Sequence, residues 1–579
     1  MPKCIPVYVE KSWKFLPEPN PLLVENLSEE LKIDDILAYL LVQRGIRDFI
    51  EARSFFRPQL EGLHNPFLMK DMDKAVIRLK KAIDNQEKVL VYGDYDVDGT
   101  TSVALMYSFL RERIEDIGFY IPERYAEGYG ISYPGINYAE ENGYSLIIAL
   151  DCGIKAIEKI EYASNKGIDF IICDHHLPGD ELPDAVAILD PKRPGCEYPY
   201  KELSGCGVGF KLLQAYSLRN GIPFSTIGAY LDLVAVSIAS DLVPMTGENK
   251  ILAYHGLLKM NSDPVPGLKA LMIVSNVGVK PVTITDIVFK VGPRINAAGR
   301  VSSGASSVKL LISQNHQEAQ VLGEQINSYN DHRKSIDGDI TEKAMKMVEE
   351  QDKIKIRKTT VLFKPDWHMG VVGIVASRLI EHYYRPTVVL TRSNGMATGS
   401  ARSVDGYDIY NAINSCSDLL ESFGGHKYAA GLSLPIENID KFSERFEAFV
   451  ASTITEDQMK PQIFVDKEIL LSDITQKFFR ILKQFEPFGP ENLAPVFVAR
   501  NVCDTGKSRQ VGRGWEHLKL SITDSQSGDC EVEAIAFNKG HLFNDIHKGK
   551  SFDLCFSIEE NVFRGVSSIQ LMVKDLRFI

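Results

Sequence analysis

Three short apolar runs in the first third of the chain each end in a cluster of acidic or imidazole side chains. Residues 89–92 run into GDYDVDGTTS, residues 146–150 into DCG, and residues 170–173 into DHH. Uninterrupted apolar runs of this length are typical of strands buried on both faces of a parallel sheet. Because the carboxyl ends of parallel strands meet in one crevice, we expect the three clusters to lie close together.

Strands and helices alternate along the chain from about residue 70 to residue 240. We expect strands at 88–93, 117–121, 145–150 and 169–173, and helices at 71–84, 100–113, 155–166, 206–219 and 224–240. Helices of this length between strands predict a doubly wound, mostly parallel sheet. The pattern therefore places the three clusters in one α/β domain.

The pattern changes after residue 305. Apolar side chains between Leu322 and Met347 recur at intervals of three, four and seven residues, which predicts one long connecting helix. A second, smaller α/β unit follows, for which we expect strands at 359–363 and 387–391 and helices at 371–383, 408–420 and 439–452. Beyond residue 460, short strands separated by turn signals predict a small β-barrel of the OB type.

The expected fold is a multidomain α/β protein. At about 150 residues per domain, a chain of 579 residues has room for roughly three or four domains. We expect an N-terminal helical arm at 1–45, a doubly wound parallel-sheet domain at 46–305, a connecting helix at 306–355, a smaller α/β domain at 356–456 and an OB-like β-barrel at 457–579. We assign no chemistry to the arm.

The composition and net charge limit the classes of protein to which this chain can belong. Hydrophobic residues make up 44% of the chain and charged residues 25%, and no apolar run is long enough to span a bilayer. The nine cysteines include no CxxC pair, which argues against a zinc cage and a disulfide framework. The start of the chain lacks the apolar core of a secretory signal, so we expect a cytoplasmic protein. Because the net charge is −12, any polyanion must bind through a local basic groove.

The three clusters together predict a metal centre. Many carboxylates cannot crowd at one point unless cations offset their repulsion. Oxygen ligands mixed with imidazole suit Mn²⁺ or Mg²⁺ better than zinc, and two such ions would clamp a phosphoryl group and generate hydroxide. A single Asp-Gly turn or strand-end histidine is usually structural, but clusters at three strand ends favour phosphoester hydrolysis. The side chains concerned are Asp94, Asp96, Asp98, Asp151, Asp174, His175 and His176.

These motifs resemble the DHH phosphoesterase superfamily and, within it, the RecJ-type single-strand-specific exonucleases. GDYDVDGTTS, DCG, DHH and SDLVP at 240–244 are similar to four motifs of the superfamily, and GPRINAAGR at 292–300 is similar to a segment distinctive of the RecJ type. WHMGVVGIVASRL, GSARS and FGGHKYAAG resemble the DHHA1 domain of that family, and EPFGPENLAPVF resembles the start of its OB domain. The resemblance extends over nearly the whole chain.

The resemblance implies roles for the acidic and imidazole side chains. It implies two Mn²⁺ or Mg²⁺ ions, with the metal ligands Asp96, Asp98, Asp151, His175 and Asp241. It gives catalytic roles to Asp94, Asp98, Asp174 and His176. Here His176 either supports a ligand or contacts the scissile phosphate. Since no carboxylate or histidine of the pattern is missing, nothing indicates an inactive copy.

The same resemblance implies contacts to single-stranded DNA. Two Gly-rich turns of the DHHA1 domain would hold the 5′ end, through Ser400, Arg402 and Ser403 and through Gly424, Gly425 and His426. Contacts to the DNA backbone would come from a Gly- and Ala-rich loop with Arg294, Asn296 and Arg300, and base stacking from Trp515 among the cations of the barrel. Spacing alone leaves open that the glycines only shape turns and that Trp515 belongs to a core.

The sequence therefore predicts a Mn²⁺- or Mg²⁺-dependent exonuclease that degrades single-stranded DNA from its 5′ end to 5′-mononucleotides. The polarity and the choice of DNA are implied by the resemblance, as are a role in recombination and repair and two partners, a helicase and a single-stranded-DNA-binding protein. We expect a monomer.

Three alternatives stay open. A DHH–DHHA1 phosphodiesterase acts on short oligonucleotides or cyclic dinucleotides, although such proteins are typically shorter. A replication scaffold with a degenerate DHH domain would have lost its motif carboxylates. An inorganic pyrophosphatase would need no third and fourth domain.

Overall fold

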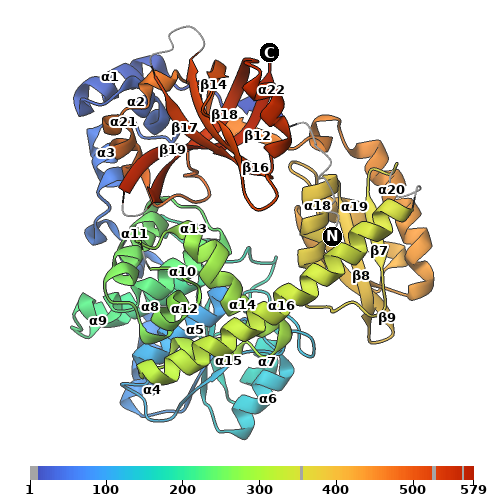
Figure 1. Ribbon diagram of the computed structural model, residues 1–579. Coiled ribbons are helices and arrows are strands. Elements are labelled where there is room, and N and C mark those ends of the chain that lie inside the picture. The colour runs from blue at the N-terminus through green and yellow to red at the C-terminus, as the bar shows by residue number, and fades with distance from the viewer. Residues whose placement is uncertain (1–10, 279, 352–355, 525–529, 564–565) are drawn as a thin grey trace. The chain divides into compact units, whose positions relative to one another are not determined.

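The chain folds into two compact units. Figure 1 shows the computed structural model, which describes residues 11–278, 280–351, 356–524, 530–563 and 566–579. The first unit contains the described residues up to Phe49, residues 334–484 and residues 494–579, and the second contains residues 50–333 and 485–493. Parts of the predicted arm, connecting helix and barrel, namely residues 1–10, 352–355, 525–529 and 564–565, lie outside the described residues.

A parallel sheet of five strands forms the centre of the second unit (Figure 1). In spatial order its strands are β3 (Ile117–Tyr120), β2 (Val89–Gly93), β4 (Leu146–Leu150), β5 (Asp169–Cys173) and β6 (Ala187–Leu189). Within this sheet, β2 is the first strand along the chain. It pairs with β3 on one side and with β4 on the other, so the strand order reverses at β2. Ligands of open α/β sheets bind at such a point, beyond the carboxyl ends of the strands.

Both faces of this sheet are buried, as the uninterrupted apolar runs predict. Val89 and Val91 belong to one core and Leu90 and Tyr92 to another. The helices of the first core include α4 (Met72–Asp84), α5 (Val97–Leu110) and α8 (Gly205–Arg219), and those of the second are α6 (Tyr133–Glu141) and α7 (Ile157–Ser164). The predicted doubly wound sheet is confirmed.

Two predicted helices of this unit differ from those observed. The helix expected at 100–113 begins earlier, as α5 at Val97, because Asp96 caps it by accepting the Gly99 N–H at 3.0 Å. The helix expected at 224–240 is two helices, α9 (Phe224–Gly228) and α10 (Leu231–Asp241). The break follows Gly228, and glycine has a low helix propensity. Helices α11 (Gly247–Ser262) and α12 (Pro266–Val274) come next.

The segment GPRINAAGR, expected as a loop, is the helix α14 (Gly292–Val301). Pro293 lies in its first turn, where the missing N–H costs nothing. A Cβ at Gly299 would lie 3.0 Å from the Tyr95 carbonyl oxygen, so this glycine lets the helix approach the GDYDVDG loop. The short helices α13 (Ile284–Asp286) and α15 (Ala305–Leu311) flank α14, and the predicted connecting helix is α16 (His316–Glu350).

A buried ion pair supports the helical layer of the second unit. Lys211 of α8 donates to Glu248 Oε1 at 3.0 Å and to the carbonyl oxygen of His64 at 2.7 Å. Tyr198 donates to the other Glu248 oxygen at 2.5 Å. Neither charged side chain is more than 1% exposed. The His64 N–H also donates to Glu248 Oε1 at 2.9 Å, so each charge is compensated by the other and by hydrogen bonds.

We expect the substitution Lys211→Met to destabilise this unit by about 3 to 5 kcal/mol, because Glu248 would keep a buried charge with no cation beside it. Thermal and urea denaturation of the variant and the parent protein measure the change. The double variant Lys211→Met/Glu248→Gln removes both charges and should recover part of the loss. A double variant no more stable than the single one would contradict this explanation.

The first unit contains a mixed five-stranded sheet (Figure 1). Its strands, in spatial order, are β10 (Ser422–His426), β11 (Ala429–Leu434), β9 (Met396–Arg402), β8 (Thr387–Ser393) and β7 (Thr360–Phe363). The helices that accompany it are α18 (Val372–Tyr383), α19 (Ile409–Asn414) and α20 (Ile439–Thr453). The helix expected at 408–420 is shorter, since α19 ends at Asn414 and only a 3₁₀ turn, Ser417–Leu419, follows.

The C-terminal strands close into a barrel. The strands are β14 (Phe497–Asp504), β16 (His517–Asp524), β17 (Val532–Ala536), β18 (Phe552–Phe563) and β19 (Val566–Phe578), with β13 (Lys467–Glu468) and β15 (Arg509–Val511) beside them. Because β14 pairs with both β18 and β16, the five longer strands form a ring, which agrees with the predicted five-stranded barrel of the OB type. The helices α21 (Gln476–Leu482) and α22 (Phe543–His547) complete this part.

The N-terminal arm is anchored to the barrel. After the strand β1 (Ser12–Phe15), which pairs in parallel with β12 (Gln462–Val465), come the helices α1 (Pro21–Leu31) and α2 (Asp35–Gln43). The next helix, α3 (Phe49–Phe56), leads into the second unit. Trp13 donates its indole N–H to buried Asp575 at 3.0 Å. A helix with the length and apolarity to cross a bilayer does not occur in the described part of the chain.

Candidate metal centre

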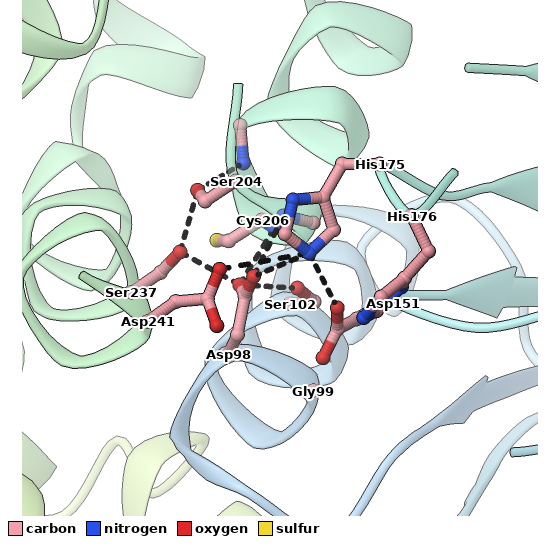
Figure 2. Close-up of polar contacts among 12 residues, drawn as sticks. Asp98, Gly99, Ser102, Asp151, His175, His176, Ser204, Cys206, Ser237 and Asp241 are labelled. Carbon is pink, nitrogen blue, oxygen red and sulfur yellow. Dashed lines mark hydrogen bonds and ion pairs between the residues drawn. The ribbon is translucent and has the colours of Figure 1, made fainter. Parts of the chain in front are cut away.

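Four side chains converge beyond the carboxyl ends of the parallel strands of the second unit (Figure 2). Asp98 lies in the first turn of α5, Asp151 follows β4, His175 lies beyond β5, and Asp241 ends α10. His175 Nε2 lies 3.1 Å from Asp151 Oδ1, 3.6 Å from Asp241 Oδ2 and 3.8 Å from Asp98 Oδ2. Four of the five predicted metal ligands are thus in contact distance, and the fifth, Asp96, caps α5 nearby.

Donors that the sequence analysis missed hold Asp98 in place (Figure 2). Its carboxylate accepts the main-chain N–H of Gly205 at 2.7 Å, the N–H of Cys206 at 2.9 Å and the hydroxyl of Ser237 at 2.7 Å. Gly205 and Cys206 open α8, and the amides of a helix N-terminus favour a negative charge. Ser204 before GCG is an N-cap signal in the sequence. Which carboxylate faces those amides is decided by tertiary packing.

Asp151 has a strained backbone. Its φ is +60°, in the left-handed region that an aspartate seldom adopts. A Cβ at Gly205 would lie 2.6 Å from the Asp151 Cβ, so only glycine fits at the start of α8. Backbone strain at a residue that points into a cluster of like charges is typical of a functional site.

The carboxylates of the cluster repel one another. Burial, followed by the charge of Asp96, raises the pKa of Asp94 to about 8. Burial, with the charges of Asp98 and Asp96, raises the pKa of Asp241 to about 8 and that of Asp151 well above its usual range. Burial and then Asp98 also raise the pKa of Asp96. Without a cation, this arrangement is electrostatically unfavourable.

These groups fit a divalent cation. Burial lowers the pKa of His175, which keeps its imidazole neutral near neutral pH. A neutral imidazole offers at most one N–H at Nε2, although three carboxylates surround that atom. Among the described residues, buried Asp94 Oδ2 has no hydrogen-bond partner. A donor set of carboxylate oxygens and imidazole is the one that Mn²⁺ and Mg²⁺ sites use, whereas structural zinc sites prefer thiolate.

Asp174 and His176 form a pair beside this cluster. Asp174 Oδ1 lies 2.7 Å from His176 Nδ1, and Asp174 Oδ2 accepts the Ile154 N–H at 2.9 Å. Burial would raise the pKa of Asp174, but the hydrogen bond from His176 and the main-chain amide lower it to about 2. Burial lowers the pKa of His176, and the bond to Asp174 outweighs burial and raises it. The Tyr129 hydroxyl lies 3.2 Å from His176 Nε2.

The three residues predicted to contact the DNA backbone lie on α14 rather than in a loop. Arg294 donates to Asn327 Oδ1 at 2.9 Å and to the carbonyl oxygens of Lys290 and Val274, so its guanidinium already binds groups of its own unit. Asn296 and Arg300 are half-buried. They flank Gly299, the residue in contact with the GDYDVDG loop. The structure thus brings α14 beside the metal centre, and the contacts of its side chains to DNA stay a prediction.

The predicted phosphate-binding residues of the first unit lie on strands rather than in turns. Ser400 and Arg402 belong to β9, directly before Ser403, and Gly424, Gly425 and His426 belong to β10. Because β11 lies between these strands, Ser400 and Gly424 oppose Gly431, and Arg402 and His426 oppose Ala429. Opposite residues of antiparallel strands share a face, so Ser400, Arg402 and His426 point to the same side. An added Cβ at Gly424 would have no neighbour within 4 Å, so the face of the sheet next to these three side chains is uncovered at Gly424.

The start of α18 covers part of that face. Arg402 donates to Ser400 Oγ at 2.6 Å. A Cβ at Gly373, in the first turn of α18, would lie 2.9 Å from the Arg402 guanidinium and 3.2 Å from Ser400 Oγ. A helix N-terminus, a guanidinium and a hydroxyl at one place form an environment that suits a phosphate.

Trp515 lies on the surface rather than in a core. Its side chain is 64% exposed in the turn between β15 and β16, where its φ is +57°. Phe537 is 52% exposed, and its ring meets His517 edge to face at 5.0 Å. Of the nearby cations, Lys519 pairs with Glu533 and Lys507 pairs with Glu531, whereas Arg509 and Arg513 are exposed, so this surface offers both aromatic area and positive charge.

Comparisons with known proteins agree with the motifs. Residues 88–238 match the DHH family, N-terminal domain, residues 354–452 match the DHHA1 domain, and residues 465–575 match the RecJ OB domain. The chain is 37% identical over 561 residues to the single-stranded-DNA-specific exonuclease RecJ of Bacillus subtilis, a match that covers 96% of this chain and 70% of the relative. The RecJ of Haemophilus influenzae is 33% identical over 536 residues, with coverage of 89% and 92%.

A solved structure supports the same assignment. The crystal structure of RecJ from Thermus thermophilus in complex with Mn²⁺ has a TM-score of 0.83 and 26% identity to this chain, and the match covers 98% of this chain and 79% of that one. The predicted resemblance and the predicted fold class are confirmed by these domain matches and identities. The chain belongs to the RecJ family of single-stranded-DNA-specific exonucleases, with DHH, DHHA1 and OB domains.

Proposed function

We propose that this protein is a Mn²⁺- or Mg²⁺-dependent exonuclease that degrades single-stranded DNA from the 5′ end and releases 5′-mononucleotides. One observation supports this proposal most directly: Asp98, Asp151 and Asp241 converge on His175, within 3.1 to 3.8 Å of one nitrogen atom. In a member of the RecJ family, this cluster would be the site where the phosphodiester is hydrolysed.

Different residues of the chain would have different roles at this site. Asp96, Asp98, Asp151, His175 and Asp241 would hold two divalent ions. When bound, the ions supply Lewis-acid charge that activates a water molecule and stabilises the charge developing on the phosphate and the leaving oxygen. The amides of Gly205 and Cys206 hold the Asp98 carboxylate in a fixed orientation. Asp94, whose carboxyl group interacts with the charge of Asp96, would support this ligand set.

His176 is suited to contact the scissile phosphate. Asp174 binds its Nδ1 and thereby directs Nε2 away from the strand end. Because the same bond raises the pKa of His176, the imidazole can be protonated at higher pH than a free histidine. A protonated Nε2 would donate a hydrogen bond to a phosphate oxygen, in place of the contact with the Tyr129 hydroxyl.

The bare face of the DHHA1 sheet is the proposed site for the 5′ phosphate. Gly424 leaves room for it, the start of α18 supplies main-chain N–H groups, and Arg402, Ser400 and His426 supply side-chain donors. Exposed Trp515 offers an aromatic surface on which a base could stack. Binding of single strands would thus combine an end-specific contact with sequence-independent stacking.

Arg402→Ala should reduce kcat/KM on 5′-phosphorylated strands by roughly 10- to 100-fold, since a hydrogen bond to a charged group contributes about 1.5 to 3 kcal/mol. Strands with a 5′ hydroxyl should be degraded at nearly the parent rate, because they lack the group that Arg402 binds. Steady-state kinetics on the two substrates test this. Arg392→Ala, an exposed arginine of neighbouring β8, is the matched control. Equal losses on both substrates would show that Arg402 does not recognise the phosphate.

The proposed function itself is tested with single-stranded DNA labelled at either end, its duplex and a dinucleotide, each with Mn²⁺. The expected result is release of mononucleotides from the 5′ end of long single strands only. Cleavage confined to the dinucleotide would instead favour a phosphodiesterase of short oligonucleotides. Roles in recombination and repair, a helicase and a single-stranded-DNA-binding protein as partners, and a monomeric state stay predictions.

A further inference from the structure

One segment of the OB-matched region packs in the second unit. The OB match covers residues 465–575, yet residues 485–493 belong to the same compact unit as the metal centre. Within that unit the segment contacts the turn that joins α10 to α11. This turn, residues 242–246, starts directly after Asp241.

The contact to the turn is made through the main chain. The Met245 N–H donates to the Pro490 carbonyl oxygen at 2.7 Å. Gly489 lies so close that an added Cβ would be 3.0 Å from the Met245 Cβ and 3.1 Å from its Cε. Met245 itself is 1% exposed. The segment therefore fixes the position of Met245, four residues beyond the metal ligand.

The segment is itself firmly anchored in the unit. Lys250 of α11 donates to the Phe485 carbonyl oxygen at 2.9 Å, and the Phe485 ring meets the rings of Phe55 and Phe56 edge to face. Buried Asn492 closes the segment into a loop, because its side-chain amide donates to the carbonyl oxygens of Phe485 and Pro487 at 3.0 and 2.9 Å. The main chains of Asn492 and Gly489 also exchange two hydrogen bonds of 3.0 Å.

Asp241 needs such support more than the other ligands do. It is the last residue of its helix, it is followed by Leu242 in the left-handed conformation, and its side chain is 27% exposed. Helix ends fray, so the position of the Asp241 carboxylate depends on what holds the turn that follows the helix. By contrast, Asp98 is buried and accepts bonds from two main-chain amides.

We propose that the segment 485–493 is a positioning element for the metal ligand Asp241, and that it acts through the Pro490–Met245 hydrogen bond and the close contact of Gly489 with Met245. The inference rests on the metal centre of the proposed function. It assigns to a stretch of the OB-matched sequence a role in metal binding, distinct from any contact with DNA.

The test is the affinity of the purified full chain for Mn²⁺, measured by isothermal titration calorimetry without DNA. Asn492→Ala opens the loop, and Gly489→Ala pushes on Met245 without backbone strain, since the φ of Gly489 is not in the left-handed region. We expect each variant to bind Mn²⁺ about 10-fold more weakly, the usual lower effect of losing support behind a metal ligand. In nuclease assays the Mn²⁺ concentration for half-maximal rate should rise about as much, with kcat nearly restored at saturating Mn²⁺.

Asn261→Ala is the matched control. Asn261 also bridges main-chain groups, with bonds to Leu257 and Val282, but it lies away from Asp241. The control should lose thermal stability and keep the parent affinity for Mn²⁺. Parent-like Mn²⁺ affinity in folded Gly489→Ala and Asn492→Ala, or an equal loss in Asn261→Ala, would overturn the proposal. Because calorimetry needs no substrate, failure of the proposed exonuclease function would appear separately, as a parent protein that binds Mn²⁺ and does not degrade single strands.

Discussion

Asp98→Asn should reduce the rate of single-strand hydrolysis by on the order of 10³-fold, a loss typical of removing one preorganised electrostatic contact from an active site. The substitution keeps the shape of the side chain and removes its negative charge. It also places an amide NH₂ where the carboxylate now accepts the N–H groups of Gly205 and Cys206. A donor would then face a donor, and the side chain could no longer point a lone pair at both α8 and a cation.

The fold should survive this change. Asp98 is one of several like charges in the cluster, so removing it relieves repulsion on Asp96, Asp151 and Asp241 and offsets the lost hydrogen bonds. Circular dichroism and thermal melting should therefore be close to those of the parent protein. Asp232→Asn is the control, because Asp232 is equally buried and accepts two main-chain N–H groups outside the cluster. An Asp98→Asn variant that keeps a tenth or more of the parent rate would exclude Asp98 as a metal ligand.

The sequence predicted those parts of the site that depend on one rule of sheet geometry. Asp98, Asp151 and His175 each follow a strand of the parallel sheet, and parallel strands bring their carboxyl ends together. Asp241 is the last residue of a helix, so the pattern of strands did not predict it. Only the family resemblance identified it. The amides of Gly205 and Cys206 were missed because their role depends on how α8 packs against α5, which local patterns do not encode.

Glycine-rich segments account for most of the errors in secondary structure. GSARS, FGGHKYAAG and GPRINAAGR looked like turns or loops because glycine disfavours both regular structures. In the structure some of these glycines permit close packing instead, although Gly424 has no neighbour within 4 Å. A Cβ at Gly399 of β9 would lie 2.0 Å from the Val389 carbonyl oxygen, and one at Gly299 would press on Tyr95. Whether a glycine ends an element or lets it approach a neighbour depends on the neighbour, which a single sequence does not show.

Removal of divalent metal should make the stability of the second unit fall as the pH rises from 6 to 8. The pKa values of Asp94 and Asp241 are raised to about 8 by burial and neighbouring carboxylates, and those of Asp96 and Asp151 are raised as well. In the unfolded chain these groups titrate near pH 4. Between about pH 4 and pH 8 the folded state therefore binds more protons than the unfolded state, and its stability decreases as the pH increases.

The pKa of Asp174 is lowered to about 2, so its effect on the pH dependence of stability has the opposite sign and falls in another pH range. Its contribution is present above about pH 4 and is lost only in stronger acid, so it does not change between pH 6 and 8. A bound cation removes the cause of the raised pKa values, because it replaces the protons that the carboxylates would otherwise retain. The stabilisation by metal should therefore grow with pH.

Thermal melting at pH 6 and pH 8, with EDTA or with Mn²⁺, measures both effects. A net difference of one proton over this range corresponds to about 3 kcal/mol, or a fall in the Tm of the EDTA-treated protein on the order of 5 to 10 °C. The protein with Mn²⁺ should change much less. Asp151→Asn removes one of the interacting carboxylates and should flatten the dependence with EDTA. A melting temperature in EDTA that is constant or rises from pH 6 to 8 would mean that the carboxylates are not held together without metal, contrary to the geometry around His175.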